Sequence, residues 1–585
     1  MCNTCDDLEL RRRHTGSHIL SYAVGLEFGE VKRGVGPWTD TGFYQDFDFG
    51  DREISDKDFK KIEKKMRWIV NKDFKVVREI VSPQEARKVF AHDEYKIELI
   101  DEIVARGEEL TFHNFVDDTG RAVYQDLCAG PHLESTGQIG AFKLMKLAGA
   151  YWRGDSDKAT LIRIYGVAYK SQEDLEAYLH LLEEAAKRDH RKLGAELDLF
   201  TFSDLVGPGL PLYTPKGTFM REKVTQILHD LKKEKGYEFV WIPHITKKDL
   251  YVKSGHWDKY KDDLFHVHGK GDTEFVMKPM NCPHHAQIYA SKMRSYRDLP
   301  VRIAETTTCY RDELPGELMG LSRVRSFTQD DTHLFVRMSQ IKEEARGVVD
   351  IIRQFYTRLE MFGEDNYWVS LSVRDPQTLD KYLGDNKNWD LAEQFLEEIA
   401  QEEALPYKRV EGEAAFYGPK LDFQFKDAIG REWQLATLQI DFVQPERFEL
   451  EYVNEKGERE RPVMIHIAIA GSLDRFLSVM IEHFAGAFPA WLAPVQCHIL
   501  PVNEAHDEYA ATVLQEVESV DGRAELYEST ESLGKRIRNC QTAKVPFAVV
   551  LGDKEQEEKS VTIRKYGEQK DETMTLESFL ALLKD

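Results

Sequence analysis

Apolar positions fall at helical spacing in one strongly charged segment of the chain, residues 171–193. These positions are Leu175, Tyr178, Leu179 and Leu182. Ser171, followed by acidic residues at 173 and 174, is typical of the start of a helix. Because the remainder of this predicted helix is polar, we expect it to connect two domains.

Short runs rich in β-branched and aromatic residues predict many strands between residues 194 and 494. Predicted strands cover residues 274–280, 301–311 and 324–335. Two further runs, 421–425 and 433–442, flank a turn at Gly430, which is typical of a hairpin. Long helical segments are expected near residues 340–362 and 474–488. Mostly short connections between the strands indicate an antiparallel sheet flanked by helices.

The two ends of the chain have different patterns. Residues 1–170 mix short strands with helices, which predicts an α+β domain. Beyond residue 495, apolar runs such as 497–502 and 547–552 precede helical segments, which indicates a small α/β domain. We therefore expect a multidomain α+β and α/β protein, divided into residues 1–170, 171–193, 194–494 and 495–585.

Composition narrows the class of protein. A chain of 585 residues is too long for one hydrophobic core, and 42% hydrophobic with 31% charged residues fits an ordinary soluble protein. No stretch approaches the ~18 apolar residues of a membrane span, and the first residues lack the apolar run of a signal peptide. The net charge of −23 argues against binding nucleic acid by bulk electrostatics. Seven scattered cysteines argue against a disulfide framework and for a cytoplasmic location.

Two segments, residues 306–335 and 466–484, carry arginines in a pattern suited to binding phosphates. Departing pyrophosphate develops negative charge, which a bidentate guanidinium neutralises better than lysine does. The two segments resemble motifs 2 and 3 of class II aminoacyl-tRNA synthetases. The resemblance implies that Arg311 holds the α-phosphate and the substrate carboxylate, while Arg475 holds the γ-phosphate. Salt-bridged surface arginines are the alternative, which two whole matching segments disfavour.

Three potential metal ligands, Cys282, His333 and His466, lie in three separate motifs, and we expect them at three separate strand ends. One thiolate and two imidazoles with an open fourth position suit a zinc ion that binds substrate. The surrounding KPMNCPHHAQIY, QDDTHLF and VMIHIAIAGS resemble motifs of the threonyl-tRNA synthetase family. The resemblance implies one Zn²⁺ per chain in the catalytic domain.

The same resemblance covers almost the whole chain and implies further site residues. Those implied in catalysis are Arg311, Arg475, Lys420 and Gln329. Those implied in ATP binding are Arg311, Glu313, Arg323, Phe327, Gln434 and Arg475, with Glu313 accepting from the adenine amine and Phe327 stacking on the base. Those implied in substrate binding are Met280, Asp331, Tyr417, Gln439 and Ser472.

A second group of histidines and cysteine lies near the N-terminus. RRHTGSHIL places two histidines on one face of a predicted helix, and VYQDLCAGPHLE supplies a cysteine and a further histidine. HxxxH paired with CxxxH resembles the editing domain of bacterial threonyl-tRNA synthetases, which hydrolyses the seryl ester of mischarged tRNA. The editing residues implied are His14, His18, Lys96, Asp126, Cys128 and His132.

Two other interpretations of this cluster remain. The four groups have the right types for a structural zinc site. Cys2 and Cys5 with the two helix histidines could instead mimic a zinc finger, but the gap from Cys5 to His14 is eight residues, short of the usual ~12. We favour hydrolytic editing and leave open whether a metal binds there.

The C-terminal region resembles the anticodon-binding domain shared by several class II enzymes. Its basic residues include Lys535, Arg536, Arg538, Lys544, Lys554, Arg564 and Lys565. The anticodon contacts implied are Glu531, Arg538, Lys554 and Arg564. A solvated helix face is the alternative interpretation. Many family members also begin with a small ubiquitin-like domain, whereas the segment resembling the editing domain stands at the start of this sequence.

Together, the resemblances imply ATP-dependent ligation of L-threonine to tRNA(Thr) through threonyl-adenylate, with Mg²⁺ accompanying ATP, and hydrolytic editing of seryl-tRNA(Thr). We expect a homodimer, with motif 1 near residues 238–243 at its interface. A non-charging paralogue would be expected to lose Arg311, Arg475 or a zinc ligand, and all of these are present. A synthetase for proline or serine is the rival enzyme, against which the metal triad argues.

Overall fold

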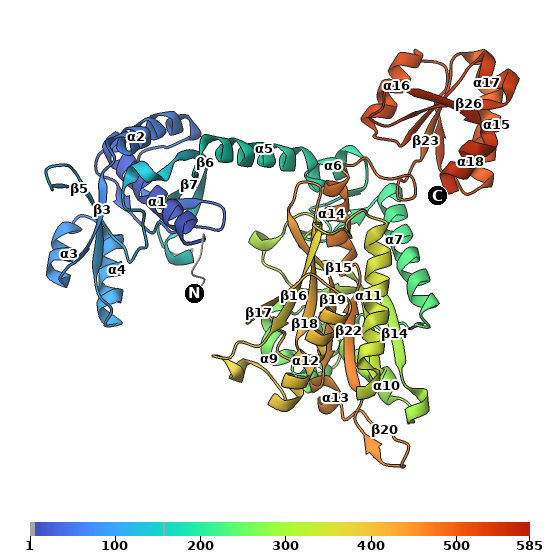
Figure 1. The fold of residues 1–585 in the computed structure, drawn as a ribbon, viewed down its shortest axis with the longest axis horizontal. Helices are drawn as coiled ribbons and strands as arrows, with labels where there is room; N and C mark the ends of the chain where they lie inside the picture. The colour runs from blue at the N-terminus through green and yellow to red at the C-terminus, as the bar shows by residue number, and fades with distance from the viewer. Residues whose placement is uncertain (1–5, 156–157, 585) are drawn as a thin grey trace. The chain divides into compact units, whose positions relative to one another are not determined.

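The computed structural model describes residues 6–155 and 158–584, which divide into two compact units, Met1–Glu183 and Glu184–Asp585. Both units contain helices and strands (Figure 1). Within the described residues, no helix is long and apolar enough to cross a membrane.

The first unit contains two antiparallel sheets with helices, so the predicted α+β domain is confirmed. One sheet has the order β1-β2-β7-β6 and the other β3-β4-β5. The strands are β1 (Lys32–Arg33), β2 (Phe43–Asp48), β3 (Lys75–Ile80), β4 (Thr111–Val116), β5 (Ala122–Leu127), β6 (Ala141–Tyr151) and β7 (Thr160–Tyr169). The helices are α1 (Asp6–Phe28), α2 (Phe59–Lys72), α3 (Pro83–Val89) and α4 (Glu94–Ala105). Ile19, Leu20 and Ala23 of α1 pack with Phe43 and Phe47 of β2 in a common core.

An eight-stranded sheet forms the centre of the second unit, in the order β10-β14-β15-β22-β19-β18-β16-β17. Its strands are β10 (Glu238–Phe239), β14 (Val301–Tyr310), β15 (Ser326–Val336), β16 (Tyr367–Val373), β17 (Tyr407–Glu411), β18 (Lys420–Lys426), β19 (Glu432–Asp441) and β22 (Val463–Ala468). The six inner strands pair antiparallel, as predicted, whereas each edge strand pairs parallel with its neighbour. The predicted hairpin is β18–β19, with Gly430 at φ +81 in its turn.

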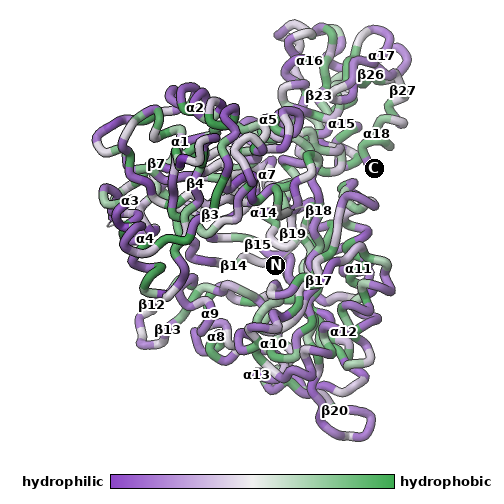
Figure 2. Tube along the Cα trace, turned by 60° about the vertical axis from the view of Figure 1, so that its left-hand side comes forward, coloured by the Kyte–Doolittle hydropathy of each residue, from purple (hydrophilic) through white to green (hydrophobic). Residues whose placement is uncertain are grey.

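Helices accompany this sheet, and several short strands lie in the segments that connect the larger elements. The helices are α7 (Pro215–Glu234), α8 (Asp249–Ser254), α9 (Trp257–Tyr260), α10 (Cys282–Ala290), α11 (Ile341–Thr357), α12 (Asn386–Glu402), α13 (Val443–Arg447) and α14 (Leu473–His483). The minor strands are β8 (Phe200–Thr201), β9 (Leu212–Tyr213), β11 (Ile245–Lys247), β12 (His266–His268), β13 (Glu274–Met277), β20 (Tyr452–Val453) and β21 (Arg459–Glu460). Along α11, Val348, Ile352 and Phe355 recur at helical spacing and enter the core. The β20–β21 hairpin is hydrophilic (Figure 2).

The C-terminal part is the predicted small α/β domain. Its sheet has the order β24-β23-β25-β26-β27, with β24, β23 and β25 parallel and the last two strands antiparallel. The strands are β23 (Cys497–Pro501), β24 (Ala524–Leu526), β25 (Phe547–Leu551), β26 (Ser560–Lys565) and β27 (Asp571–Thr575). The helices are α15 (Asp507–Ser519), α16 (Leu533–Thr542), α17 (Asp553–Glu558) and α18 (Leu576–Lys584).

The connecting segment differs from the single helix predicted over residues 171–193. It forms two helices, α5 (Gln172–Arg188) and α6 (His190–Glu196). Asp189 separates them because its backbone, at φ −48 and ψ 118, leaves the helical conformation. Its side chain accepts from Arg191 N and so caps the second helix.

Candidate active site

A cavity of about 380 Å³ lies against the central sheet of the second unit. Alternate residues of β15 line it, because side chains two positions apart on a strand share a face. The residues of β15 that do so are Phe327, Gln329, Asp331 and His333. The sequence-predicted residues from other elements that also line it are Met280, Cys282, Arg311, Tyr417, Gln434, Gln439, His466, Ser472 and Arg475.

One end of the cavity holds a buried thiol and two imidazoles. The potential ligand atoms of Cys282, His333 and His466 all lie within 4.8 Å of one another. The expectation of three strand ends is wrong: Cys282 begins helix α10, while both histidines lie within strands. His333 and His466 are direct partners in the β15–β22 register, which brings their rings together. The donor set and its convergence fit a zinc ion with room for a further ligand.

Two neighbours that the sequence analysis missed orient these imidazoles. Asp441 Oδ2 lies 2.8 Å from Nε2 of His466, which leaves Nδ1 facing Nε2 of His333 at 3.0 Å. His285 Nδ1 lies 2.7 Å from Nδ1 of His333. Such partners fix the ring orientation of metal-binding histidines. Burial keeps His333 neutral by lowering its pKa and raises the pKa of the Cys282 thiol.

The two predicted phosphate-binding arginines reach the other side of the cavity. The guanidinium of Arg311 lies 5.1 Å from the centre of the Phe327 ring, and that of Arg475 lies 5.9 Å from the Trp433 ring. Within the described residues, neither arginine forms an ion pair, whereas Arg221 beside them binds Asp474 at 2.9 Å. Burial lowers the pKa of Arg475. Two guanidiniums without a carboxylate partner therefore face a cavity that a polyanion can enter.

Three predicted residues do not line this cavity. Glu313 binds Arg323 at 2.6 Å in the loop between β14 and β15. Lys420 on β18 forms an ion pair with the Asp422 carboxylate. Gln434, which lines the cavity, donates to the same carboxylate at 2.7 Å, so Asp422 links Lys420 to the cavity wall.

The second predicted cluster also assembles, in the first unit. The potential ligand atoms of His14, His18, Cys128 and His132 lie within 4.8 Å of one another. Cys128 Sγ is 3.2 Å from Nε2 of His14 and 3.2 Å from Nε2 of His132. Both helix histidines and the cysteine line a cavity of about 600 Å³. Cys2 and Cys5, invoked in the zinc-finger alternative, lie outside the described residues.

Burial sets the protonation states of this cluster. It lowers the pKa of His14 to about 4 and raises that of Cys128 to about 12. The pKa values of His18 and His132 are also well below the ordinary value, again chiefly through burial. The cluster therefore presents neutral imidazoles, which can accept a proton, beside a neutral thiol.

A buried ion pair adds charge to the same cavity. Lys96 Nζ lies 2.6 Å from Oδ1 of Asp126, and both side chains line the cavity. Burial alone would raise the pKa of Asp126, but the charges of Lys96 and Arg33 outweigh it and lower that pKa. Trp38, which the sequence analysis did not single out, forms a further wall, with its ring 4.9 Å from the His14 ring.

The four predicted anticodon residues do not form one cluster. Lys554 and Glu531 follow the carboxyl ends of the parallel strands β25 and β24, so they share one edge of the sheet. Arg564 pairs with Ala548 near the start of β25, away from that edge, and binds Asp571 at 2.6 Å. Arg538 is exposed on α16.

Arg536 does not belong to the predicted basic surface. Its side chain is 1% exposed and donates to the backbone oxygens of Pro501 at 2.6 Å and Glu531 at 3.0 Å. A buried guanidinium whose N–H groups donate to backbone carbonyls links the loops that carry them and offers no exposed donor to RNA.

Comparisons with known proteins match all three parts of the chain. Residues 111–165 match the family described as threonyl and alanyl tRNA synthetase second additional domain. Residues 265–484 match the tRNA synthetase class II core domain (G, H, P, S and T), and residues 496–585 match an anticodon binding domain.

Individual relatives give the same result. The chain is 50% identical to a threonine–tRNA ligase of Gloeobacter violaceus, over 98% of this chain and 92% of that protein. It is 46% identical to the threonine–tRNA ligase of Staphylococcus carnosus, over 98% of this chain and 87% of that protein. The crystal structure of the RNA binding domain of threonyl-tRNA synthetase from Cryptosporidium parvum matches with a TM-score of 0.64 at 34% identity, covering 68% of this chain and 98% of that one.

Proposed function

The chain belongs to the threonine–tRNA ligases, which are class II aminoacyl-tRNA synthetases, and from its two sites we propose that it joins L-threonine to tRNA(Thr) through an adenylate and then removes serine attached in error. The observation that carries the first part is the meeting of Arg311 and Arg475, which form no ion pair within the described residues, with the Cys282 cluster in one cavity.

In the first step, a carboxylate oxygen of threonine attacks the α-phosphorus of ATP, and the bond to pyrophosphate breaks. Arg311 holds the α-phosphate and the attacking carboxylate, while Arg475 neutralises charge that develops on the γ-phosphate. Phe327 lies beside Arg311 and stacks on the adenine. Mg²⁺ bound with ATP would offset further phosphate charge. A hydroxyl of the terminal tRNA ribose then attacks the acyl carbon, and AMP leaves.

Cys282, His333 and His466 would hold a zinc ion, with Asp441 and His285 orienting the two imidazoles. When bound, zinc would offer open positions to the amino and hydroxyl groups of threonine. Valine lacks that hydroxyl, and a lost polar contact of this kind supports discrimination of about 10⁴–10⁵. Serine lacks only a methyl group, which is worth about 1–3 kcal/mol, so serine would be attached at an appreciable rate.

The N-terminal cluster supplies the proposed correction. Neutral His14 and His18 can accept a proton from water as it attacks the seryl ester, and the ribose oxygen leaves as a hydroxyl. Lys96, fixed by Asp126, adds a positive charge near the ester or the RNA backbone. The residues present also suit a metal ion by type, which makes metal content one outcome to measure.

The remaining partners follow from the other regions. The C-terminal domain would bind the anticodon, with Glu531 and Lys554 on one edge of its sheet. A second copy of the chain would cover the segment near β10, where the exposed fraction of Trp241 is 76%. We expect the enzyme in the cytoplasm, because the reducing conditions there keep thiols free and the five cysteines of the described residues are all free thiols. The domain bounds 1–170, 171–193, 194–494 and 495–585 stay a prediction, and each matched family segment falls inside one of them.

The direct test is amino-acid-dependent exchange of pyrophosphate into ATP, measured with each of the twenty amino acids. We expect strong exchange with threonine, weaker exchange with serine and none with valine or proline. Exchange that favours another amino acid over threonine would contradict the proposed substrate.

A further inference from the structure

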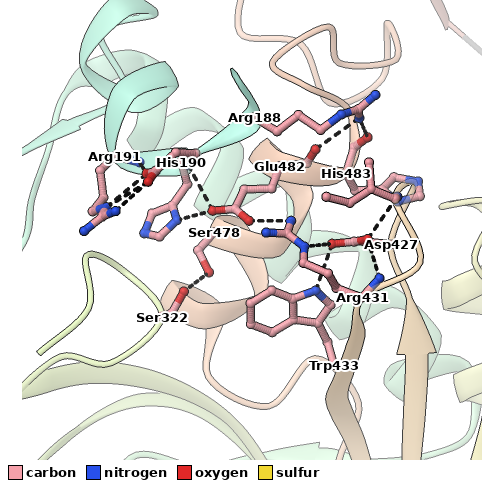
Figure 3. A network of polar contacts seen from close by, with 12 residues as sticks. Arg188, His190, Arg191, Ser322, Asp427, Arg431, Trp433, Ser478, Glu482 and His483 are labelled. Atoms are coloured by element: carbon pink, nitrogen blue, oxygen red, sulfur yellow. Dashed lines mark hydrogen bonds and ion pairs between the residues drawn. The ribbon is translucent and has the colours of Figure 1, made fainter. Parts of the chain in front are cut away.

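His190, the first residue of α6, lies 3% exposed between helix α14 and the loop that precedes β15. Its backbone N–H donates to Oε1 of Glu482 at 3.0 Å, and its Nδ1 lies 2.6 Å from the same oxygen (Figure 3). The N–H of Leu321 lies 3.0 Å from Nε2 and must donate to it. The imidazole therefore carries its proton on Nδ1, donates to Glu482 and accepts from the loop.

The loop is shaped to this imidazole. Gly320 has a φ of +51, a conformation that favours glycine. A Cβ built at Gly320 would lie 2.2 Å from Nε2 of His190, so no other residue fits without moving the loop. Two consecutive residues, Gly320 and Leu321, thus depend on the same ring nitrogen.

On the Nδ1 side of the imidazole, Glu482 is held in place by the charged side chain of Arg431. Arg431 Nη2 lies 2.6 Å from Oε2 of Glu482, and Arg431 in turn binds Asp427 at 2.7 Å (Figure 3). Burial alone would raise the pKa of Glu482, but hydrogen bonds from His190 and the charge of Arg431 outweigh it and lower that pKa. Glu482 therefore stays a carboxylate and keeps the proton of His190 on Nδ1.

The loop so held carries two residues, Glu313 and Arg323, that the family resemblance implies in ATP binding. Arg323, two residues after Leu321, binds Glu313, the proposed partner of the adenine amine. Ser322 Oγ lies 2.8 Å from Ser478 Oγ, and Ser478 donates to the backbone oxygen of Arg475 at 2.7 Å. The loop is thereby connected to helix α14, which carries the proposed phosphate-binding Arg475, and to Glu313, which the resemblance implies at the adenine.

We propose that His190 is a positioning residue for ATP, which holds the loop of Glu313 and Arg323 by accepting the N–H of Leu321. This proposal rests on the proposed adenylation function. Asp189, His190 and Glu482 also have the atom types of a metal site. Both ring nitrogens and Oε1 of Glu482 are already engaged within the chain, so we assign the group to positioning.

Two substitutions of similar size separate the roles of the two ring nitrogens. His190→Gln can place an amide oxygen near Nε2 and keep the acceptor for Leu321. His190→Asn reaches only as far as Nδ1, keeps a donor for Glu482 and leaves the loop N–H without a partner. In threonine-dependent pyrophosphate exchange, we expect His190→Asn to raise KM for ATP about tenfold, with KM for threonine nearly unchanged. His190→Gln should restore most of the affinity.

Gly320→Ala provides a test that leaves His190 in place. The added methyl group displaces the loop from the imidazole, so KM for ATP should rise as in His190→Asn. Since both changes break one contact, the double variant should be little worse than either single variant. Lys192→Ala, an exposed change on the same helix, is the matched control and should leave KM for ATP unchanged.

Three results would overturn the proposal while the wild type is active. The first is an unchanged KM for ATP in both His190→Asn and Gly320→Ala. The second is a His190→Gln variant that behaves like His190→Asn. The third is a change in both KM values and kcat together with a lower Tm, as expected of a purely structural residue. Absence of threonine-dependent exchange in the wild type would instead contradict the proposed function, and this proposal with it.

Discussion

His333 and His466 face each other across the β15–β22 pair, with Nε2 of the first 3.0 Å from Nδ1 of the second. The two residues are 133 positions apart in the chain. Antiparallel register makes them neighbours, and Cys282 at the start of α10 completes the group. The proposed choice of threonine over valine depends on this contact between strands.

Metal content tests that choice directly. We expect the purified protein to contain about one tightly bound zinc ion per chain, because a thiolate and two imidazoles converge in a buried site. Cys282→Ala and His466→Ala should lose both the metal, measured by elemental analysis, and threonine-dependent exchange. Cys497→Ala changes a buried cysteine that does not line the cavity and should keep both. Full activity in zinc-free protein would contradict the role assigned to zinc.

Arg311→Ala and Arg475→Ala should reduce the rate of adenylate formation by about 10²–10³, because each removes a preorganised charge from the transition state. Neither guanidinium has a carboxylate partner among the described residues, so Tm should change little. Arg302→Ala is the opposite control, since Arg302 binds both oxygens of Glu344, at 2.6 and 2.7 Å. It should lower Tm and leave exchange nearly intact. Unfolding of the Arg311 and Arg475 variants with normal activity per folded molecule would assign both arginines to the scaffold.

Changing His14 and His18 together to alanine should leave threonyl-tRNA synthesis intact and allow seryl-tRNA(Thr) to accumulate. The reason is that these neutral imidazoles are the proposed proton acceptors in hydrolysis, and neither lies in the second unit. Deacylation of preformed seryl-tRNA measures the effect, with His180→Ala on the exposed face of α5 as the control. Unchanged clearance of seryl-tRNA would remove the cluster from editing, and loss of charging as well would indicate a structural role.

Acid should weaken the first unit. Burial lowers the pKa of His14 from 6.5 to about 4. Between these pH values His14 is therefore protonated in the unfolded chain and neutral in the folded unit. The contribution of His14 to stability is therefore present above pH 6.5 and lost as the pH falls toward 4. Facing groups His18 and His132 act in the same direction, since their pKa values are lowered too.

Thermal unfolding followed by circular dichroism at several pH values checks this expectation. Tm of the wild type should fall on acidification through this range, and His14→Gln should show a smaller fall because glutamine does not titrate. An equal fall in the two proteins would show that His14 does not contribute to the acid sensitivity.

The buried pair of Lys232 and Asp330 should contribute strongly to folding. Their side chains are 1% and 0% exposed, and Oδ2 of Asp330 also accepts from Ile469 N at 3.0 Å. Lys232→Met leaves a buried carboxylate without its partner, which costs about 3–5 kcal/mol in the free energy of unfolding. Lys235→Met breaks an exposed pair with Asp350 and should cost about 0–1 kcal/mol in the same denaturant titration. Equal costs would show that burial does not decide the strength of these pairs.

Local patterns were enough to predict several elements of the fold. Strand β15 was predicted from a run rich in β-branched and aromatic residues, and the β18–β19 hairpin from two such runs flanking Gly430, because residue preference and turn chemistry are local properties. The break between α5 and α6 was missed, since Asp189 caps the second helix within a charged run, residues 183–193, that contains no glycine or proline to mark a helix end. Arg536 was taken for a surface charge because sequence alone does not reveal which carbonyls surround a guanidinium.

The sequence by itself determined which chemistry is available: a thiol, imidazoles and guanidiniums in segments of recognisable pattern, and the spacing of His14 and His18 on one helix. Only the tertiary structure decided which of these groups meet. Asp441 and His285 approach His466 and His333 from other elements, and His190 reaches Leu321 across 131 residues. The physical reason is that hydrogen bonds and burial act over a few ångströms in space. Sheet register and helix packing, set by the whole core, fix those short distances.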